Sequence, residues 1–193
     1  DQNGSQEVYK YSITSNSFTQ AASNSILSVY KRTALIGNSL YVTGIYQIQK
    51  YNIISGTWST VPNAPTTEEG IRSSININDK LYTLIKLNSL NLYEFNPTSN
   101  LWRFVTSYVN KLSVTHGITW NNRKFFAGGY SIQLAEILED FSLAVLIDKD
   151  PDQPVLPVAF KNLLYMIGPN PAGDKSCKIT PGSYEISPYN PEI

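Results

Sequence analysis

The sequence contains few residues that could act as nucleophiles or metal ligands. His116 is its only histidine and Cys177 its only cysteine. A Cys–His nucleophilic pair needs the two side chains within hydrogen-bond distance, and these residues lie 61 positions apart in the chain. A zinc site built from three histidines or from several thiolates needs more ligands than the chain supplies. We therefore expect no catalytic residues, no metal centre and no cofactor, and a protein that is not an enzyme.

Two acidic clusters are the other candidates for chemistry. Glu68 and Glu69 are adjacent, and Glu136, Glu139 and Asp140 lie close together in the sequence. Neighbouring residues of an extended strand point to opposite faces, so Glu68 and Glu69 would not converge on one substrate. Acidic residues are seldom buried. We therefore expect both clusters to be solvated loop charges.

The balance of charge excludes some classes of partner. Lys and Arg together number 15, and Asp and Glu together number 15. A net charge of zero provides no general attraction for nucleic acid or for an anionic membrane. No apolar stretch approaches the roughly 20 residues that cross a bilayer. The single cysteine cannot form an internal disulfide, which favours a reducing compartment such as the cytoplasm over secretion.

The elements that must position any site are visible as repeats. Three segments have an aromatic residue, six intervening residues and a second aromatic residue, namely Tyr11 to Phe18, Tyr51 to Trp58 and Phe95 to Trp102. Each carries Ser-Asn or Ser-Gly at the same offset, and Asn and Gly tolerate the positive φ of a tight turn. Each segment is therefore predicted to be strand, turn, strand.

A second family of segments alternates with the first. Its members are residues 34–42, 75–83, 119–127 and 158–166, each with apolar residues, a turn pair, and then a hydrophobic residue and an aromatic residue. The predicted turn pairs are Gly37-Asn38, Asn78-Asp79, Asn122-Arg123 and Lys161-Asn162. A two-residue turn between apolar runs is typical of a β-hairpin.

The spacing of the repeats indicates the fold class. Tyr41, Tyr82, Phe126 and Tyr165 are separated by 41, 44 and 39 residues. A period of about 40–50 residues with four short strands per unit is typical of propeller blades. Armadillo-like helical repeats share this period, but Gly, Pro, Asn and Ser recur about every 8–12 residues and leave no room for paired helices. Residues 134–146 are predicted to be the outer strands of a degenerate blade, with a short helix as the alternative.

The order of these features resembles the kelch repeat. Its landmarks are paired glycines after the second strand, then a Tyr and a Trp separated by six residues. The segments 51–58 and 95–102 match the second landmark, the segment 11–18 matches loosely, and Gly128-Gly129 matches the first. Arg32 and Arg72 stand where many kelch repeats carry an arginine before the first strand. The resemblance covers roughly residues 6–168 and implies an all-β protein, a β-propeller of kelch-like four-stranded blades, with about four blades in this chain.

The resemblance also suggests a domain organisation. Residues 1–193 would form a single propeller domain or a segment of one, and residues 169–193 a Pro-rich tail or the start of a further blade. Residues 6–20 could supply the outer strands of the blade that contains residues 158–168, which would close a ring through the termini. Alternatively, the chain is part of a larger ring with open edges, and the incomplete propeller forms an oligomer.

In kelch-like rings, the loops on one face bind partners. The candidate partner-binding residues in such loops are Tyr30, Arg32, Tyr46, Glu69, Arg72, His116 and Tyr130. Tyr and Arg are the usual hot-spot residues of protein interfaces. The expected function is therefore a protein–protein interaction module. The alternative is a carbohydrate-binding, lectin-like propeller, but Trp58, Trp102 and Trp120 all fall at repeat positions and are predicted to be core.

Overall fold

The computed structural model describes most of the chain, and every regular element in the described part is a β-strand. No helix in it is long and apolar enough to cross a membrane. The all-β prediction is thus confirmed. The described residues are 9–21, 32–44, 47–65, 70–86, 89–109, 112, 114–129, 132–149, 156–160, 162–167, 177–179 and 186–188.

The chain divides into two compact units. The first contains residues 1–87 and 94–103, and the second contains residues 88–93 and 104–193. The boundary crosses two strands, β9 (Leu90–Asn96) and β10 (Leu101–Tyr108). These two strands complete a four-stranded sheet with the order β10-β9-β8-β7.

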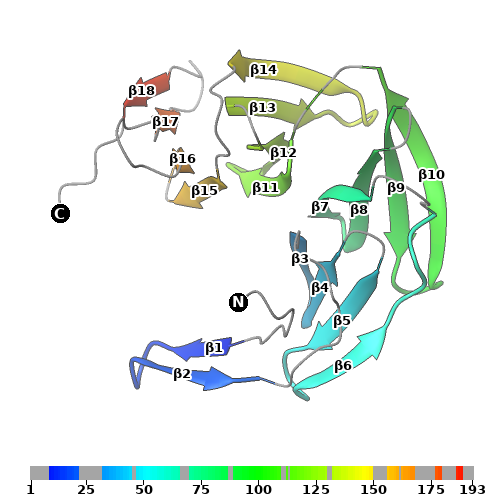
Figure 1. The fold of residues 1–193 in the computed structure, drawn as a ribbon, viewed down its shortest axis with the longest axis vertical. Coiled ribbons are helices and arrows are strands. Elements are labelled where there is room, and N and C mark those ends of the chain that lie inside the picture. Colours follow the sequence, from blue (N-terminus) through cyan, green and yellow to red (C-terminus); the bar gives the residue numbers. More distant parts are fainter. Residues whose placement is uncertain are drawn as a thin grey trace. The chain divides into compact units, whose positions relative to one another are not determined.

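The first unit contains hairpins and an antiparallel sheet whose strands are neighbours in chain order (Figure 1). Strands β1 (Tyr9–Ser12) and β2 (Ser17–Gln20) form a two-stranded sheet. A four-stranded sheet follows, with β3 (Arg32–Ile36), β4 (Ser39–Thr43), β5 (Ile48–Asn52) and β6 (Thr57–Thr60). Strands β7 (Ile71–Ile77) and β8 (Lys80–Lys86) form the next hairpin.

The second unit contains two further four-stranded antiparallel sheets. One consists of β11 (His116–Trp120), β12 (Arg123–Ala127), β13 (Ile132–Ile137) and β14 (Leu143–Lys149). The prediction of outer strands over residues 134–146 is thus confirmed. The other consists of β15 (Leu156–Phe160), β16 (Leu163–Ile167), β17 (Cys177–Ile179) and β18 (Ile186–Pro188).

The last sheet corrects one expectation about ring closure. Ring closure through the termini, one of the two alternatives, places residues 6–20 as the outer strands beside residues 158–168. Instead, β16 pairs with β17, with Met166 opposite Cys177, and β17 pairs with β18. The Pro-rich tail therefore supplies these outer strands, and the position proposed for residues 6–20 is already taken.

The aromatic repeats form strand–turn–strand units, as predicted. The rings of Tyr51 and Trp58 lie 5.0 Å apart between centroids, and the two residues are directly opposite each other on β5 and β6. The rings of Tyr11 and Phe18 are 4.9 Å apart, and those of Phe95 and Trp102 are 5.1 Å apart. The six intervening residues therefore contain one turn that brings the second aromatic ring back to the first, and such cross-strand aromatic pairs stabilise a sheet.

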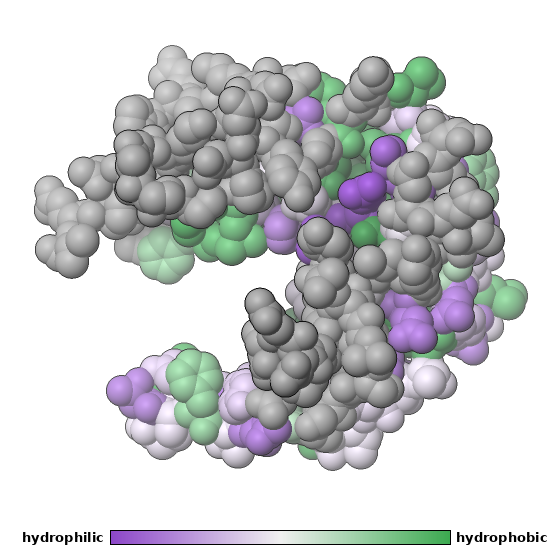
Figure 2. All heavy atoms as spheres, in the orientation of Figure 1, coloured by the Kyte–Doolittle hydropathy of each residue, from purple (hydrophilic) through white to green (hydrophobic). Residues whose placement is uncertain are grey.

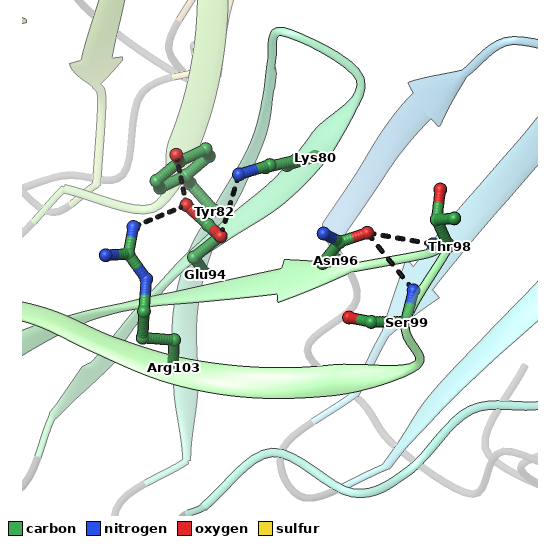
Figure 3. A network of polar contacts seen from close by, with 7 residues as sticks. All are labelled: Lys80, Tyr82, Glu94, Asn96, Thr98, Ser99 and Arg103. Atoms are coloured by element: carbon green, nitrogen blue, oxygen red, sulfur yellow. Dashed lines mark hydrogen bonds and ion pairs between the residues drawn. The ribbon is translucent and has the colours of Figure 1, made fainter.

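The turns inside these aromatic repeats share one geometry. Asn16, Gly56 and Asn100 all have positive φ, at 47°, 68° and 58°. In two of the three turns, the asparagine after the first aromatic residue caps the turn. The Oδ1 atom of Asn52 accepts hydrogen bonds from the backbone N–H groups of residues 54 and 55, and that of Asn96 from residues 98 and 99 (Figure 3). These side chains replace backbone acceptors in the turn.

The shorter turns of the other repeat are also visible. Asn78 and Asp79 have φ of 51° and 58°, as a hairpin turn of this type requires. In the next sheet the turn is one residue earlier than predicted. Asn121 and Asn122 have positive φ, and Arg123 is already the first residue of β12. The last predicted pair falls partly outside the described residues, because Lys161 is not among them.

The aromatic residues predicted to form the core are not equally buried. Tyr41, Tyr82 and Trp120 are buried, at 2%, 4% and 3% exposure. In the first unit, Tyr41 packs edge-on against Phe95, with ring centroids 6.2 Å apart. Trp58 and Trp102 are only half-buried, because they lie on β6 and β10, the outer strands of their sheets. The prediction that these two indoles belong to the core was therefore wrong, because each is only partly buried.

Candidate functional site

The first candidate site lies where the chain enters β3 and β7. Arg32 is the first residue of β3, and Arg72 is the second residue of β7, where the register shifts between Ile71 and Ser73. Both arginines are half-buried. They were predicted in loops before the first strands, but they belong to the strands themselves. A bulge re-aims the backbone locally, which distinguishes the surroundings of Arg72 from those of Arg32.

Hydrogen bonds join the two strand entries. Arg32 Nε donates to the backbone carbonyl of Arg72 at 3.2 Å. Thr43 Oγ1 donates to the carbonyl of Arg32 at 3.2 Å and lies 3.1 Å from the hydroxyl of Ser74 in a buried contact. The side chain of Arg32 thus reaches the backbone of Arg72, although the two residues are 40 positions apart in the sequence.

His116 occupies the corresponding repeat position in the second unit. It is the first residue of β11 and lies opposite Ala127, the last residue of β12. Arg32 is related in the same way to Thr43, the last residue of β4. The Nδ1 atom of His116 is 2.8 Å from Thr115 Oγ1. His116 and Cys177 lie in different sheets.

The structure does not test the remaining predicted partner-binding residues. Tyr30, Tyr46, Glu69 and Tyr130 lie outside the described residues. Of the seven candidates, Arg32, Arg72 and His116 are therefore the three whose surroundings are known. All three are cationic or titratable and stand at the beginning of the first strand of a sheet.

A second polar cluster surrounds Glu94 and was missed by the sequence analysis. Glu94 is buried on β9 and accepts three hydrogen bonds (Figure 3). Tyr82 Oη donates to Oε2 at 2.6 Å, Arg103 Nη2 donates to Oε2 at 2.9 Å, and Lys80 Nζ donates to Oε1 at 3.0 Å. The donors come from β8 and β10, on either side of β9.

The repeat contained a signal for this cluster. Next to the aromatic pair Tyr51 and Trp58, Lys50 lies opposite Ser59. If β9 and β10 have the same register, Glu94, which precedes Phe95, stands opposite Arg103, which follows Trp102, and these two side chains do form an ion pair. Extending the pair Phe95 and Trp102 by one residue in this way would have predicted this ion pair.

The electrostatics of the cluster indicate a structural role. Burial alone raises the pKa of Glu94, but the hydrogen bonds from Tyr82, Lys80 and Arg103 outweigh burial and lower the pKa to about 2. Burial raises the pKa of Tyr82, and the bond to Glu94 raises it further. At neutral pH the carboxylate is ionised and bound by three donors, so it fixes adjacent strands and is poorly suited to accept a proton from a substrate.

A related ion pair in the second unit corrects the expectation about the acidic cluster at residues 136–140. Glu136 is 8% exposed on β13, and both of its carboxylate oxygens accept hydrogen bonds from Arg123. The guanidinium carbon of Arg123 also lies 5.5 Å from the ring centroid of Phe125. Glu136 is therefore not a solvated loop charge, because β13 carries it inward. Glu139 and Asp140 are exposed in the turn after β13, as predicted.

Within the described residues, no group of three or more His, Cys, Asp or Glu side chains is placed to hold a metal ion. Neither protein-family models nor curated proteins include a match to this chain.

Proposed function

We propose that the chain is a protein-interaction module built as a segment of a kelch-like β-propeller. Successive four-stranded antiparallel sheets, whose strands are neighbours in chain order, support this proposal. Within the first unit β3 lies beside β7, and within the second unit β11 lies beside β15. A propeller places the first strand of each blade next to the first strand of the following blade, and its blades have four strands.

The observation that carries the binding role is the linked pair Arg32 and Arg72. Arginine is enriched at interface hot spots and binds carboxylates through two parallel N–H donors. Two arginines at one strand-entry edge therefore suit a protein partner that presents Asp or Glu side chains. The hydrogen bond from Arg32 to the Arg72 carbonyl holds this edge in one arrangement before a partner arrives, which reduces the entropy lost on binding.

The positions of the tryptophans favour a protein partner over a carbohydrate. Sugar sites commonly display an exposed aromatic ring. Trp120 is buried, and Trp58 and Trp102 pack against Tyr51 and Phe95 across their strands. Trp102 Nε1 also donates to the carbonyl of Pro62 at 2.9 Å. All three indoles therefore take part in packing or hydrogen bonding inside the protein.

The proposal is tested by affinity capture from a cell extract with quantitative mass spectrometry. The baits are the wild type, Arg32→Ala and Arg72→Ala, with Lys10→Ala as a control because Lys10 is an exposed cation on β1. We expect at least one protein to be retained by the wild type and by Lys10→Ala and to be lost by both arginine variants. Thermal melts of all four proteins confirm that they are folded.

Two results would overturn the proposal. One is a set of captured proteins that is the same for all four baits. The other is saturable binding on a glycan array that survives both arginine substitutions, which would favour the lectin-like alternative. We propose no catalytic step for this chain.

A further inference from the structure

Strand β10 forms the outer edge of its sheet and is the longest strand in the described part of the chain. It spans Leu101–Tyr108, eight residues, and stands at the end of the strand order β10-β9-β8-β7. It contains no proline or glycine. Among the described residues, no strand pairs with the side of β10 that faces away from β9. This edge is therefore long enough to be a template for a further strand.

The outer strands of the other four-stranded sheets carry features that discourage pairing. Strand β6 has four residues, and β18 has three and ends on Pro188. Strand β14 ends in Asp148 and Lys149, and a register shift interrupts its pairing with β13. Short length, proline, charge and bulges are the usual means by which proteins protect an edge. The one charged residue of β10, Arg103, is bound to Glu94 of the neighbouring strand, so it does not protect the edge in this way.

Apolar side chains on and beside β10 are exposed. Leu101 and Phe104 are 67% and 52% exposed, and Val109, which follows the strand, is 95% exposed. Figure 2 shows hydrophobic atoms at the surface where Figure 1 places β10. The ring of Phe104 contacts that of Tyr93 edge-on, with centroids 5.6 Å apart, so its place on the sheet is fixed. A long, apolar and exposed edge strand is a site at which another chain adds.

A second copy of the chain offers an edge that matches β10. Its own β10 has the same length and the same apolar residues, and two such strands can pair antiparallel about a two-fold axis. Residues that are directly opposite each other point to the same face of a sheet, so the axis must pass through a residue. When it passes through Phe104, the two phenylalanines are opposite each other and Arg103 is opposite Val105. Like charges are then not directly opposite, and the aromatic pair contributes to the pairing.

We propose that the chain forms a homodimer in which β10 of one copy pairs antiparallel with β10 of the other, with Phe104 at the two-fold axis. The two four-stranded sheets then form one continuous sheet. The pairing occupies both edges, so assembly stops at two chains. The inference goes beyond the proposed function, because Arg32 and Arg72 lie on β3 and β7 and take no part in it. The dimer and the binding of an acidic partner can therefore fail separately.

Sedimentation equilibrium over a range of protein concentrations tests the dimer. One strand pair buries less area than a standard interface, so we expect a dissociation constant on the order of 10–100 μM. Phe104→Lys removes the ring pair and places two like charges opposite each other, and it should raise this constant about tenfold. The matched control is Ile54→Lys, which adds the same charge at a 77% exposed position between β5 and β6 and should leave the constant unchanged. Thermal melts show that both variants are folded.

Cross-linking tests the position of the axis. Cys177, the only cysteine, is first replaced by serine, and Phe104→Cys is then added. Residues directly opposite each other have Cβ atoms about 4.5–5.5 Å apart, close to the separation across a disulfide bond. Diamide, which takes up the two electrons and two protons of the paired thiols, should therefore yield a covalent dimer. Ile54→Cys in the same background is the control and should remain monomeric.

The proposal is overturned by a chain that stays monomeric across the concentration range, or by association that continues beyond two chains. It is also overturned by a dimer that Phe104→Lys and Ile54→Lys affect equally, or by one in which Phe104→Cys cross-links no more than Ile54→Cys. Either of the last two results would show that the chain associates through a different surface.

Discussion

The hydroxyl of Tyr82 donates a 2.6 Å hydrogen bond to the carboxylate of Glu94, and both side chains are buried. The bond joins β8 to β9. In the second unit Phe125 stands opposite Glu136 without a hydroxyl, and Arg123 binds both carboxylate oxygens instead. The two sheets therefore retain the same buried carboxylate but satisfy it with different donors.

Replacing Tyr82 by phenylalanine should lower the free energy of unfolding by about 1–2 kcal/mol, because a buried hydrogen bond to a charged acceptor is lost. The ring itself should still fit, since Phe125 occupies the equivalent position when the turn at Asn121-Asn122 is aligned with the turn at Asn78-Asp79. Urea denaturation measures the change. A double-mutant cycle with Glu94→Gln isolates the coupling between the two side chains, and a coupling energy near zero would show that the bond does not contribute.

The ion-pair cluster should make stability depend on acidity. An unfolded glutamate titrates near 4.5, and in the folded chain the pKa of Glu94 is about 2. A group with a lowered folded pKa stabilises above its unfolded pKa and loses that contribution as the pH falls towards its folded pKa. The wild type should therefore lose stability relative to Glu94→Gln between about pH 4.5 and 2. Thermal melts across this range measure the difference, with the exposed Glu139→Gln as control. Parallel curves for wild type and Glu94→Gln would contradict it.

The strands and turns were predictable because their signals are local. The six-residue spacing of Tyr51 and Trp58 contains both the turn and the register of its hairpin, and Asn78-Asp79 is a turn by its residue types alone. The outer strands of the last sheet were not predictable in this way. Proline punctuates the tail, and the partner of β16 is set by pairing across a long connection to β17.

Only part of the candidate site was predictable, because local signals identify single residues but not the contacts between strands that are distant in sequence. Arg32 and Arg72 were found from their repeat positions, but the bond between them depends on β3 lying beside β7. Glu136 was placed in solvent because three acidic residues lie close together in sequence. Glu136 is buried on β13 and Glu139 is exposed in the turn that follows, and this difference becomes visible only when the end of β13 is known.

The turn residue Gly56 allows a test of the repeat geometry. Its φ is 68°, a region that disfavours residues with a Cβ atom. A Cβ there would meet only the Tyr51 hydroxyl, at an ordinary 3.7 Å, so the expected effect is backbone strain alone. Gly56→Ala should destabilise by about 1–2 kcal/mol. Gly56→Asn should be nearly neutral, because Asn16 and Asn100 hold the same position in the other two turns. Equal melting temperatures for the two variants would refute this account.

The aromatic repeat predicts a gradient of destabilisation that follows burial. Phe95 is 1% exposed, so Phe95→Ala should lower the free energy of unfolding by about 3–5 kcal/mol. Trp58 is half-buried, and Trp58→Ala should lower it by about 1–2 kcal/mol, because part of the indole is already in water. Phe18 holds the same repeat position as Trp58 but is 71% exposed, and Phe18→Ala should have the smallest effect.

Urea denaturation of the three variants, followed by circular dichroism, measures the order. Phe18→Ala is also the control for removing an aromatic ring from a cross-strand pair, since its contact with Tyr11 has nearly the same separation as that of Trp58 with Tyr51. If Phe18→Ala and Trp58→Ala destabilise equally, the ring contact itself sets the stability of these hairpins. If Trp58→Ala is clearly worse, the neighbouring strand β4 provides the difference, which is the element that β1 lacks in the described chain.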